Sequence, residues 1–439
     1  MTGAAAESFF DDVVTLHTGD MLAVLPSLPA DSFDSGVTDP PYHLQSIVKR
    51  FQKTGGADRA RTTSGPHQRT AAGFMNQSWD GGDIAFRADT WREVFRVLKP
   101  GAYLLAFGGT RTYHRIACAI EDAGFVIYDM IAWAYGQGFP KSKNVALAFE
   151  ATLCERRSDD EWIYLDSGEP MRREPPFRCA EADAWWGWGT LLKPAFEPIA
   201  LVRKPIAGTT IENLVHWGTG ALNIDACRIA GPMDGVWGTS NATCKPTFNQ
   251  SPGQHDYRTA PHDDGRFPAN IIHDGSAEVM AVFPDDAGAF APVRGSEPSA
   301  VTDHVYGDRG RVAGAFHDDS GSAARFFYTA KADADDRLGS RHPTVKPLDL
   351  IRYLVRLVTP RGGRVLDPFA GTGTTGEAAW HEGMRATLIE REPAYCTDIR
   401  RRMALVRASD RERAHESIKA AGKEKPPGPL FEGLGEAAE

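Results

Sequence analysis

The segment RVLDPFAGTGTTG at residues 364–376 decides how this chain folds. Its apolar pair at 365–366 predicts a short buried strand, and the run at 377–381 predicts the helix that follows. Between them, Gly371 and Gly373 let the backbone turn sharply and approach a ligand without a Cβ in the way. A strand, a glycine-rich turn and a helix start are typical of a site for a nucleotide-like cofactor.

The next strand, predicted at 385–389, ends at Glu390. Its carboxylate could accept hydrogen bonds from both ribose hydroxyls of an adenosyl group. The glycine spacing alone also satisfies the dinucleotide fingerprint of dehydrogenases, and a tight turn without a ligand would use the same residues. The preceding DPF at 367–369 favours S-adenosylmethionine.

A second informative segment, TDPPY at residues 38–42, follows an apolar strand predicted at 33–37. Its two prolines stiffen the backbone, remove two N–H donors and leave carbonyl oxygens as acceptors. Asp39 adds a carboxylate and Tyr42 adds a flat ring. Acceptors beside a stacking platform suit an exocyclic amino group on a planar base, whereas a proline-rich turn capping a strand is the alternative without a ligand.

Three motifs together carry a family resemblance. They are DPPY at 39–42, HPTVKP at 342–347 and DPFAGTGTT at 367–375. In this order they resemble beta-class S-adenosylmethionine-dependent DNA amino-methyltransferases, in which DPPY precedes the cofactor loop. The resemblance covers roughly 13–150, 193–205 and 323–405.

The resemblance implies an α/β fold, a doubly wound and mostly parallel Rossmann-like sheet with one reversed strand and an inserted target-recognition module. The apolar patterns agree, because helix and strand periods alternate from 91 to 133 and the segment 196–202 suits the reversed strand. The expected parts are 1–205 as the catalytic half of the core, 206–322 as the target-recognition domain, 323–408 as the cofactor-binding half and 409–439 as a disordered tail.

The stretch 134–192 is irregular and contains three tryptophans close together, Trp185, Trp186 and Trp188. Large aromatic side chains bury much apolar area, so we interpret them as the packing of a small subdomain. Stacking on a nucleic-acid base is the alternative.

The resemblance also assigns roles to single residues. The implied catalytic residues are Asp39, Pro40, Pro41 and Tyr42. The implied cofactor-binding residues are Asp20, Asp39, His342, Thr344, Lys346, Asp367, Phe369, Gly371, Gly373, Thr374, Thr375 and Glu390. Asp20 would approach the cofactor adenine, although an aspartate at this position also suits a helix N-cap. Lys346 could hold the cofactor carboxylate or be a solvated lysine at a helix start.

Residues 43–78 form a locally basic stretch in a chain whose net charge is −9. Its basic residues are Lys49, Arg50, Lys53, Arg59, Arg61 and Arg69, whereas its acidic residue is Asp58. The overall charge argues against a non-specific nucleic-acid binder, but this stretch suits contacts with DNA phosphates. A solvated loop without a role is the alternative.

We therefore expect methyl transfer from S-adenosylmethionine, with S-adenosylhomocysteine as product, to N6 of an adenine flipped out of duplex DNA. Adenine-modifying relatives usually carry Asp where this chain has Asp39, and cytosine-modifying relatives usually carry Ser, so N4 of cytosine is the first alternative. Methyl transfer to RNA or a protein amide, a DNA-binding protein without catalysis and a dehydrogenase are further alternatives.

The chain has no apolar run of about eighteen residues and no visible signal peptide. Its six cysteines form no CxxC pair, so we expect a reduced, cytoplasmic protein without a metal site. The resemblance implies double-stranded DNA as partner and a bacterial or phage-encoded, nucleoid-associated protein. It also raises a homodimer and a cognate restriction endonuclease as candidate partners.

Overall fold

The computed structural model describes residues 6–42, 83–136, 138, 142–153, 180–230, 265–285, 321–330, 334–342 and 344–422. The chain forms two compact units. The larger combines Met1–Ala134 with Glu197–Glu439, and the smaller is Tyr135–Phe196.

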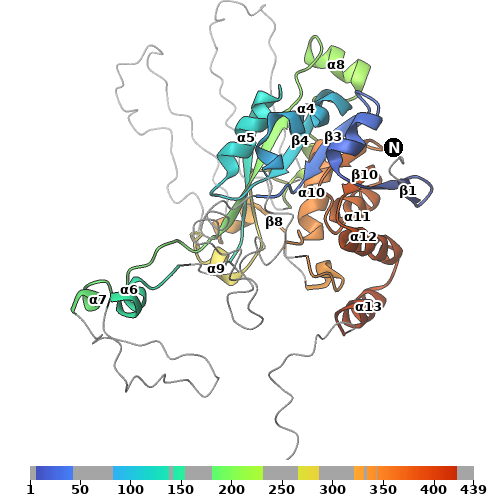
Figure 1. Ribbon diagram of the computed structural model, residues 1–439. Coiled ribbons are helices and arrows are strands. Elements are labelled where there is room, and N and C mark those ends of the chain that lie inside the picture. The colour runs from blue at the N-terminus through green and yellow to red at the C-terminus, as the bar shows by residue number, and fades with distance from the viewer. Residues whose placement is uncertain are drawn as a thin grey trace, which may run out of the picture. The chain divides into compact units, whose positions relative to one another are not determined.

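The larger unit is built on one sheet, which has ten strands in the described part of the chain (Figure 1). Their spatial order is β1-β2-β10-β9-β3-β4-β6-β5-β7-β8. The bounds are β1 Ala6–Phe9, β2 Val14–Thr18, β3 Phe33–Thr38, β4 Leu98–Phe107, β5 Val126–Ala134, β6 Phe196–Arg203, β7 Ile271–His273, β8 Tyr328–Thr329, β9 Arg364–Asp367 and β10 Arg385–Glu390.

The strand directions confirm the expected doubly wound sheet. The pairs β2/β10, β10/β9, β9/β3 and β3/β4 are parallel, and β6 runs antiparallel to β4 as the reversed strand. A second antiparallel strand, β1, pairs with β2 at the edge and was not expected. The turn between them has three successive left-handed residues, Phe10, Asp11 and Asp12, with φ of 56°, 55° and 65°. No glycine marks this turn, so the sequence pattern did not reveal it.

The described helices follow the predicted alternation with strands. Their bounds are α1 Met21–Val24, α4 Ala88–Val97, α5 Tyr113–Asp122, α6 Val145–Leu153, α7 Ala180–Ala184, α8 Thr210–Trp217, α9 Ala277–Met280, α10 Leu348–Val358, α11 Thr374–His381, α12 Pro393–Leu405 and α13 Asp410–Gly422. Among these described helices, none has both the length and the apolar character that crossing a membrane needs.

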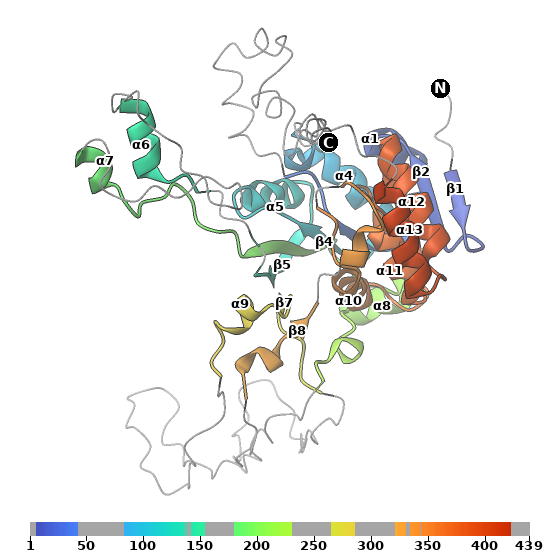
Figure 2. The ribbon, with the colours of Figure 1, turned by 90° about the horizontal axis from the view of Figure 1, so that it is seen from below.

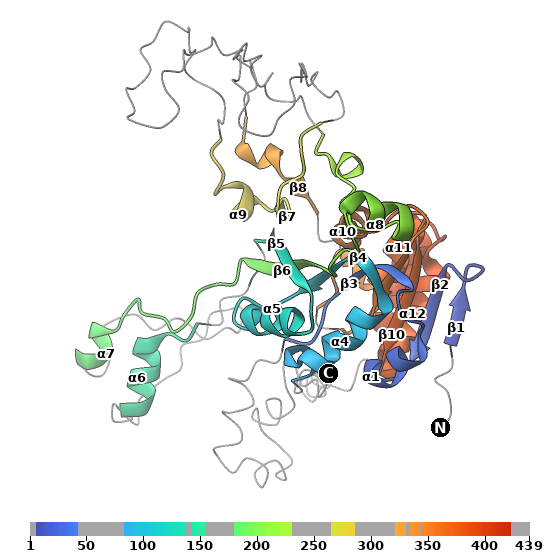
Figure 3. The same ribbon diagram turned by 90° about the horizontal axis from the view of Figure 1, so that it is seen from above.

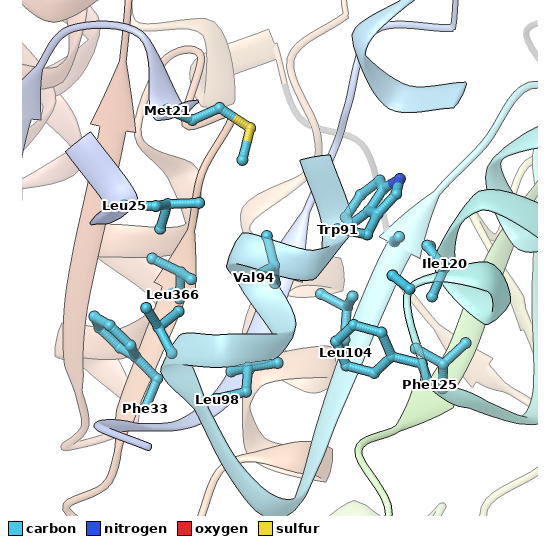
Figure 4. Packing of buried hydrophobic residues seen from close by; sticks show 14 of the residues in the cluster. Met21, Leu25, Phe33, Trp91, Val94, Leu98, Leu104, Ile120, Phe125 and Leu366 are labelled. Carbon is cyan, nitrogen blue, oxygen red and sulfur yellow. The ribbon is translucent and has the colours of Figure 1, made fainter. Parts of the chain in front are cut away.

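Helices cover both faces of the central strands (Figures 2 and 3). Trp91 and Val94 of α4 are fully buried in one apolar cluster with α1, α5 and the sheet (Figure 4). Ile389 of β10 belongs to the same cluster. The preceding Leu388 lies on the other face beside α11, where a Cβ added to Gly376 would come within 2.8 Å of its Cδ1. This alternation along β10 places α4 and α11 on opposite faces.

The order of the strands brings the two informative loops together. Ser35 and Gly36 of β3 pair in parallel with Val365 and Leu366 of β9. The TDPPY segment and the glycine loop therefore leave the same carboxyl edge of the sheet from adjacent strands. Open α/β sheets bind their ligands at this edge.

The smaller unit differs from its expected packing. Helices α6 and α7 meet through the buried Ala146 and Ala182. Trp185 and Trp188 contact each other edge to face, but Trp188 remains 60% exposed. The three tryptophans therefore lie at the surface of the described part of this unit.

Two expected parts of the chain also look different in the structure. Within 206–322, the described residues belong to the larger unit, and β7 extends its sheet beside β5. Their role in target recognition stays a prediction. The tail expected to be disordered from 409 instead begins with helix α13, Asp410–Gly422. The low hydrophobicity of this segment led to the prediction of disorder. The helix is instead held by an ion pair, because Arg413 binds the buried carboxylate of Glu377.

Two tryptophan-to-alanine substitutions should differ greatly in their effect on stability, because Trp91 is buried and Trp188 is exposed. Trp91→Ala should lower the free energy of unfolding by about 3–5 kcal/mol, because it removes a fully buried indole and leaves a cavity. Trp188→Ala, the same change at an exposed position, should cost less than about 1 kcal/mol. Urea unfolding followed by circular dichroism measures both, and equal losses would contradict the packing described.

Candidate active site

Asp367, the last residue of β9, connects three elements at the sheet edge. Its buried carboxylate accepts hydrogen bonds from the hydroxyl of Thr38 at 2.7 Å and from that of Thr375 at 2.6 Å. The backbone N–H of Phe369 also donates to it, at 3.2 Å. Thr38 ends β3 and Thr375 lies in the first turn of α11, so one side chain joins the ends of two parallel strands and the helix after the glycine loop.

Burial controls the acidity of this carboxyl group. Removal from water raises the pKa of Asp367 to about 6, because it disfavours the ionised form. The hydrogen bonds from Thr375, Thr38 and Phe369 lower the pKa, and the charge of Asp39 raises it. The group is mostly ionised at neutral pH, and its three donors stabilise that buried charge.

The glycine loop is attached to the end of the next strand through Glu390. One carboxylate oxygen accepts from the N–H of Gly371 at 2.8 Å, and the other accepts from the N–H of Glu392 at 2.7 Å. Gly371 and Gly373 have φ of +52° and +79°, a conformation that favours glycine. Burial raises the pKa of Glu390 to about 7, against the opposing effect of these backbone bonds. Its ionisation therefore changes near neutral pH.

Asp20 lies beside this strand end. Its side chain accepts from the N–H of Leu22 at 2.9 Å as the N-cap of α1, which confirms the capping interpretation. The N–H of Gly19 donates to the carbonyl of Glu390 at 2.8 Å. Asp20 thus follows a residue bonded to Glu390, and its approach to a cofactor adenine stays a prediction.

A cluster of four polar side chains forms where β3 ends. The hydroxyl of Tyr42 donates to Asp39 Oδ1 at 2.7 Å and lies 3.2 Å from Glu197 Oε2. The ammonium of Lys346 lies 2.7 Å from Asp39 Oδ2 and 3.0 Å from Glu197 Oε2. The four residues come from three parts of the chain that the sheet brings together.

The charges in this cluster determine the protonation of its donors. Burial alone would lower the pKa of Lys346, but the charges of Asp39 and Glu197 outweigh burial and raise it. Burial raises the pKa of Tyr42 well above its usual value, and the same carboxylates raise it further. At neutral pH Lys346 is therefore a cation and Tyr42 a neutral hydroxyl that donates.

The ring of Tyr42 is held by the loop after β4. A Cβ added to Gly109 would come within 3.2 Å of Tyr42 Cδ2, so the backbone there lies against the ring. The ammonium of Lys346 is 5.5 Å from the centre of this ring and 4.9 Å from that of Phe107. Tyr42 is therefore oriented by contacts with its ring as well as with its hydroxyl.

The HPTVKP motif lies against the glycine loop. A Cβ added to Gly371 would be 3.4 Å from His342 Nε2, and the ring of His342 meets Tyr395 edge to face at 4.5 Å. The N–H of Thr344 donates to His342 Nδ1 at 3.3 Å. Burial lowers the pKa of His342 to about 4, helped by the charges of Lys346 and Arg337, so the ring is neutral at pH 7.

A buried ion network supports the glycine loop. Arg402 of α12 donates to the carbonyl of Thr372 at 2.8 Å and pairs with Glu377 of α11 at 2.6 Å. The second oxygen of Glu377 binds Arg413 of α13 at 2.7 Å. Burial opposes ionisation of Glu377, but the nearby His381 and the charges of both arginines lower its pKa to about 2. The network therefore ties the loop to three helices.

The predicted residues separate into two neighbouring groups in the structure. Asp39, Tyr42 and Lys346 meet in the polar cluster, so Lys346 contacts Asp39, and its role towards a cofactor carboxylate stays a prediction. Asp367, Gly371, Thr375 and Glu390 meet around the glycine loop. The other predicted residues are less directly engaged: Pro40 and Thr374 are buried, Pro41 is partly buried, and Phe369 packs on the apolar cluster.

Sequence reasoning missed Glu197 and Thr38. Glu197 is a single acidic residue before a proline, with no motif around it, and the β4–β6 pairing is what brings it near Tyr42. Thr38 stands next to Asp39, so its place at the end of an apolar strand was the available signal. The basic residues Lys49, Arg50, Lys53, Arg59, Arg61 and Arg69, as well as Pro343, lie outside the described residues.

A family comparison accounts for most of the chain. The family model described as DNA methylase, for N6 and N4 enzymes, matches residues 33–401. The type II methyltransferase M.HindIII of Haemophilus influenzae is 28% identical over 171 residues, which make up 38% of this chain and 48% of that protein. M2.DpnII of Streptococcus pneumoniae, also a type II methyltransferase, is 37% identical over 68 residues, 16% of this chain and 25% of that protein. The matches thus span half or less of these relatives.

Solved structures also align with the chain. The PvuII DNA methyltransferase, described as cytosine-N4-specific, aligns over 94% of this chain and 93% of its own at 14% identity, with a TM-score of 0.40.

The hydrogen bond between Thr38 and Asp367 gives a testable pH dependence. Thr38→Val keeps the side-chain shape and removes the donor, so it should lower the free energy of unfolding by about 1.5–3 kcal/mol at pH 8, where Asp367 is ionised. The pKa of Asp367 is raised to about 6, so the loss should shrink at pH 5, where the carboxyl group is mostly protonated.

Urea unfolding at both pH values measures this difference. Thr397→Val is the matched control, because its exposed hydroxyl donates to the carbonyl of Pro393 at 3.1 Å and touches no buried charge. A Thr38→Val loss that is the same at pH 5 and pH 8 would show that the hydroxyl does not stabilise the ionised carboxylate.

Proposed function

The chain belongs to the DNA methylase family of S-adenosylmethionine-dependent N6/N4 amino-methyltransferases, and we propose that it methylates the exocyclic N6 of adenine in duplex DNA at a specific sequence. The observation that carries this proposal is the polar cluster of Asp39 and Tyr42 beside the glycine loop, with both loops joined through Asp367. An acceptor group and a flat ring thus stand at the same sheet edge as the proposed cofactor site.

The residues around the glycine loop fit an adenosyl cofactor. Each oxygen of Glu390 accepts one backbone bond, which leaves acceptor capacity for ribose hydroxyls. Asp20 follows Gly19, whose N–H binds the carbonyl of Glu390, so Asp20 is proposed to meet the adenine edge. The left-handed Gly371 and Gly373 keep the loop narrow. When bound, S-adenosylmethionine would supply an electrophilic methyl group.

The polar cluster fits the amino group of a flipped base. A base inside a duplex is out of reach, so it must leave the stack, and the ring of Tyr42 would stack on it. Asp39 and the carbonyl of Pro40 would accept the two amino hydrogens. An aryl amine is a poor nucleophile because its lone pair is delocalised, and two acceptors localise that pair on nitrogen. Positioning then supplies much of the rate, and the proton released after alkylation passes to Asp39.

Adenine is favoured over cytosine by the residue at position 39. A carboxylate accepts a hydrogen bond more strongly than a hydroxyl does, which suits the amine of adenine. Cytosine N4 is the alternative target within the same family. The basic stretch 43–78 is proposed to contact DNA phosphates, and a homodimer and a cognate endonuclease stay predictions.

Nucleoside analysis tests the target. Incubation of the purified chain with S-adenosylmethionine and DNA from a methylation-free host should yield N6-methyladenine after digestion and mass spectrometry. Asp39→Ala should abolish this product and change the Kd for S-adenosylmethionine by less than about twofold, because the base-facing acceptor is lost and the glycine loop is untouched. Asp89→Asn, at an exposed position of α4, is the control.

Three outcomes would count against the proposal. Detection of N4-methylcytosine without N6-methyladenine would show that the target base is cytosine, and it would leave the cofactor assignment intact. Methylation of RNA or protein in place of DNA would change the substrate class. Substantial methyl transfer by Asp39→Ala would reject the assigned role of this carboxylate.

Cofactor affinity should depend on pH through Glu390. The pKa of Glu390 is raised to about 7 by burial, and its ionised form is the better acceptor for ribose hydroxyls. Affinity should therefore fall as pH decreases through 7, with a Kd about tenfold higher at pH 6 than at pH 8. Protonation of Asp367, whose pKa is about 6, would act in the same direction at lower pH.

Calorimetry with S-adenosylmethionine at pH 6 and pH 8 measures this change. Glu390→Gln should bind more weakly at pH 8 and lose most of the pH dependence, and it also corrects for titration of the cofactor's own amino group. An unchanged Kd in this variant would show that Glu390 does not hold the cofactor.

A further inference from the structure

Glu197 occupies a position in the polar cluster that no motif predicted. Its Oε2 lies 3.0 Å from the ammonium of Lys346 and 3.2 Å from the hydroxyl of Tyr42. The same two donors bind Asp39, at 2.7 Å each. Glu197 and Asp39 therefore share both of their donors, one ammonium and one phenol.

The proposed reaction requires Asp39 to accept a third hydrogen bond. Its Oδ1 already accepts from Tyr42 and its Oδ2 from Lys346, yet it must also accept an amino hydrogen of the target base. A carboxylate has about four acceptor positions, so a third bond is geometrically available. An ammonium that relied on Asp39 alone, however, would draw electron density from that carboxylate and weaken it as an acceptor.

Burial makes the counter-ion of Lys346 important. The side chain of Lys346 is 7% exposed, and a charge removed from water needs a partner of opposite sign. Two carboxylates surround this one ammonium, so the cluster has one more acidic group than basic groups. With Glu197 present, Lys346 remains paired while Asp39 binds a substrate.

The backbone of Glu197 is held firmly. Glu197 lies in β6 two residues before Ile199, which is opposite Phe107 at the start of the β4–β6 pairing. The N–H of Gly108 donates to the carbonyl of Pro198 at 2.9 Å, directly after Glu197. Gly109, the next residue, lies against the ring of Tyr42. The same strand pairing thus positions Glu197 and the backbone surface behind Tyr42.

We propose that Glu197 is a positioning residue for methyl transfer. It shares the ammonium of Lys346 with Asp39, and thereby keeps Asp39 a strong acceptor for the target amine. This role rests on the function proposed above. It assigns no contact between Glu197 and the base, and it predicts that Glu197 acts through Lys346.

A double-mutant cycle tests this role. Glu197→Gln leaves Asp39 as the remaining charged partner of Lys346, so kcat on unmethylated DNA should fall at least about tenfold while the Kd for S-adenosylmethionine stays within about twofold. Lys346→Met should also reduce kcat, because two carboxylates then face each other without a cation. The combination of Glu197→Gln with Lys346→Met removes both charges and should recover part of the kcat lost in Glu197→Gln.

The controls separate positioning from folding. Glu121→Gln, on the exposed surface of α5, should leave kcat unchanged. Melting temperatures of all variants report the folded state, and a purely structural role would lower the melting temperature of the double variant without recovering kcat. Glu197→Asp, which retains the charge on a shorter side chain, should keep more activity than Glu197→Gln.

Each outcome decides a separate question. A wild-type kcat in Glu197→Gln, or losses that add in the double variant, would overturn the role of Glu197 and leave the proposed function standing. An absence of methyl transfer to DNA by the wild-type chain would reject the proposed function, and the role of Glu197 with it. Recovery in the double variant with an unchanged cofactor Kd supports both.

Discussion

The buried carboxylate of Asp367 is the constraint on which the rest of the site depends. It binds Thr38, which lies 329 positions away along the chain, and Thr375, in the first turn of the helix after the glycine loop. Two loops from distant parts of the sequence are thereby fixed at one sheet edge. Burial raises the pKa of this carboxyl group to about 6, so the donors around it stabilise a charge that the interior disfavours. Any loss of these donors would loosen the contact between the TDPPY loop and the glycine loop.

A second buried carboxylate, Glu377, helps to hold the glycine loop in place. Glu377 is fully buried and binds Arg402 and Arg413, and Arg402 in turn donates to the carbonyl of Thr372 in the loop. Removing one partner of such a group is costly, because it leaves an uncompensated charge in the interior. The position of the glycine loop is therefore coupled to helix α13, which comes well after the loop in the sequence. This coupling explains why the highly charged helix is ordered although it has little apolar surface to bury.

Acceptor groups are the common feature of the polar cluster that we propose to face the target base. Methyl transfer to an amine needs acceptors for the amino hydrogens more than it needs a strong base, because the alkylated nitrogen loses its proton readily. Asp39 provides such an acceptor, yet the buried Lys346 competes for it. A second carboxylate, Glu197, lies 3.0 Å from the same ammonium, and in the role proposed for it this contact relieves the competition. Residues outside the motif thus set the electrostatic conditions under which the motif residues act.

The sequence by itself determined the local elements of this protein: the strands before both loops, the left-handed glycines and the carboxylate that ends the next strand. These features depend on neighbouring residues, whose apolar period and backbone freedom can be read directly. The tertiary structure decided what depends on distant pairings. The register of β6 against β4 placed Glu197 beside Lys346, and the pairing of β3 with β9 placed Thr38 beside Asp367. Helix α13 was missed because its order comes from Arg413 and a buried glutamate, and an ion pair between separate elements leaves no periodic signal in the chain.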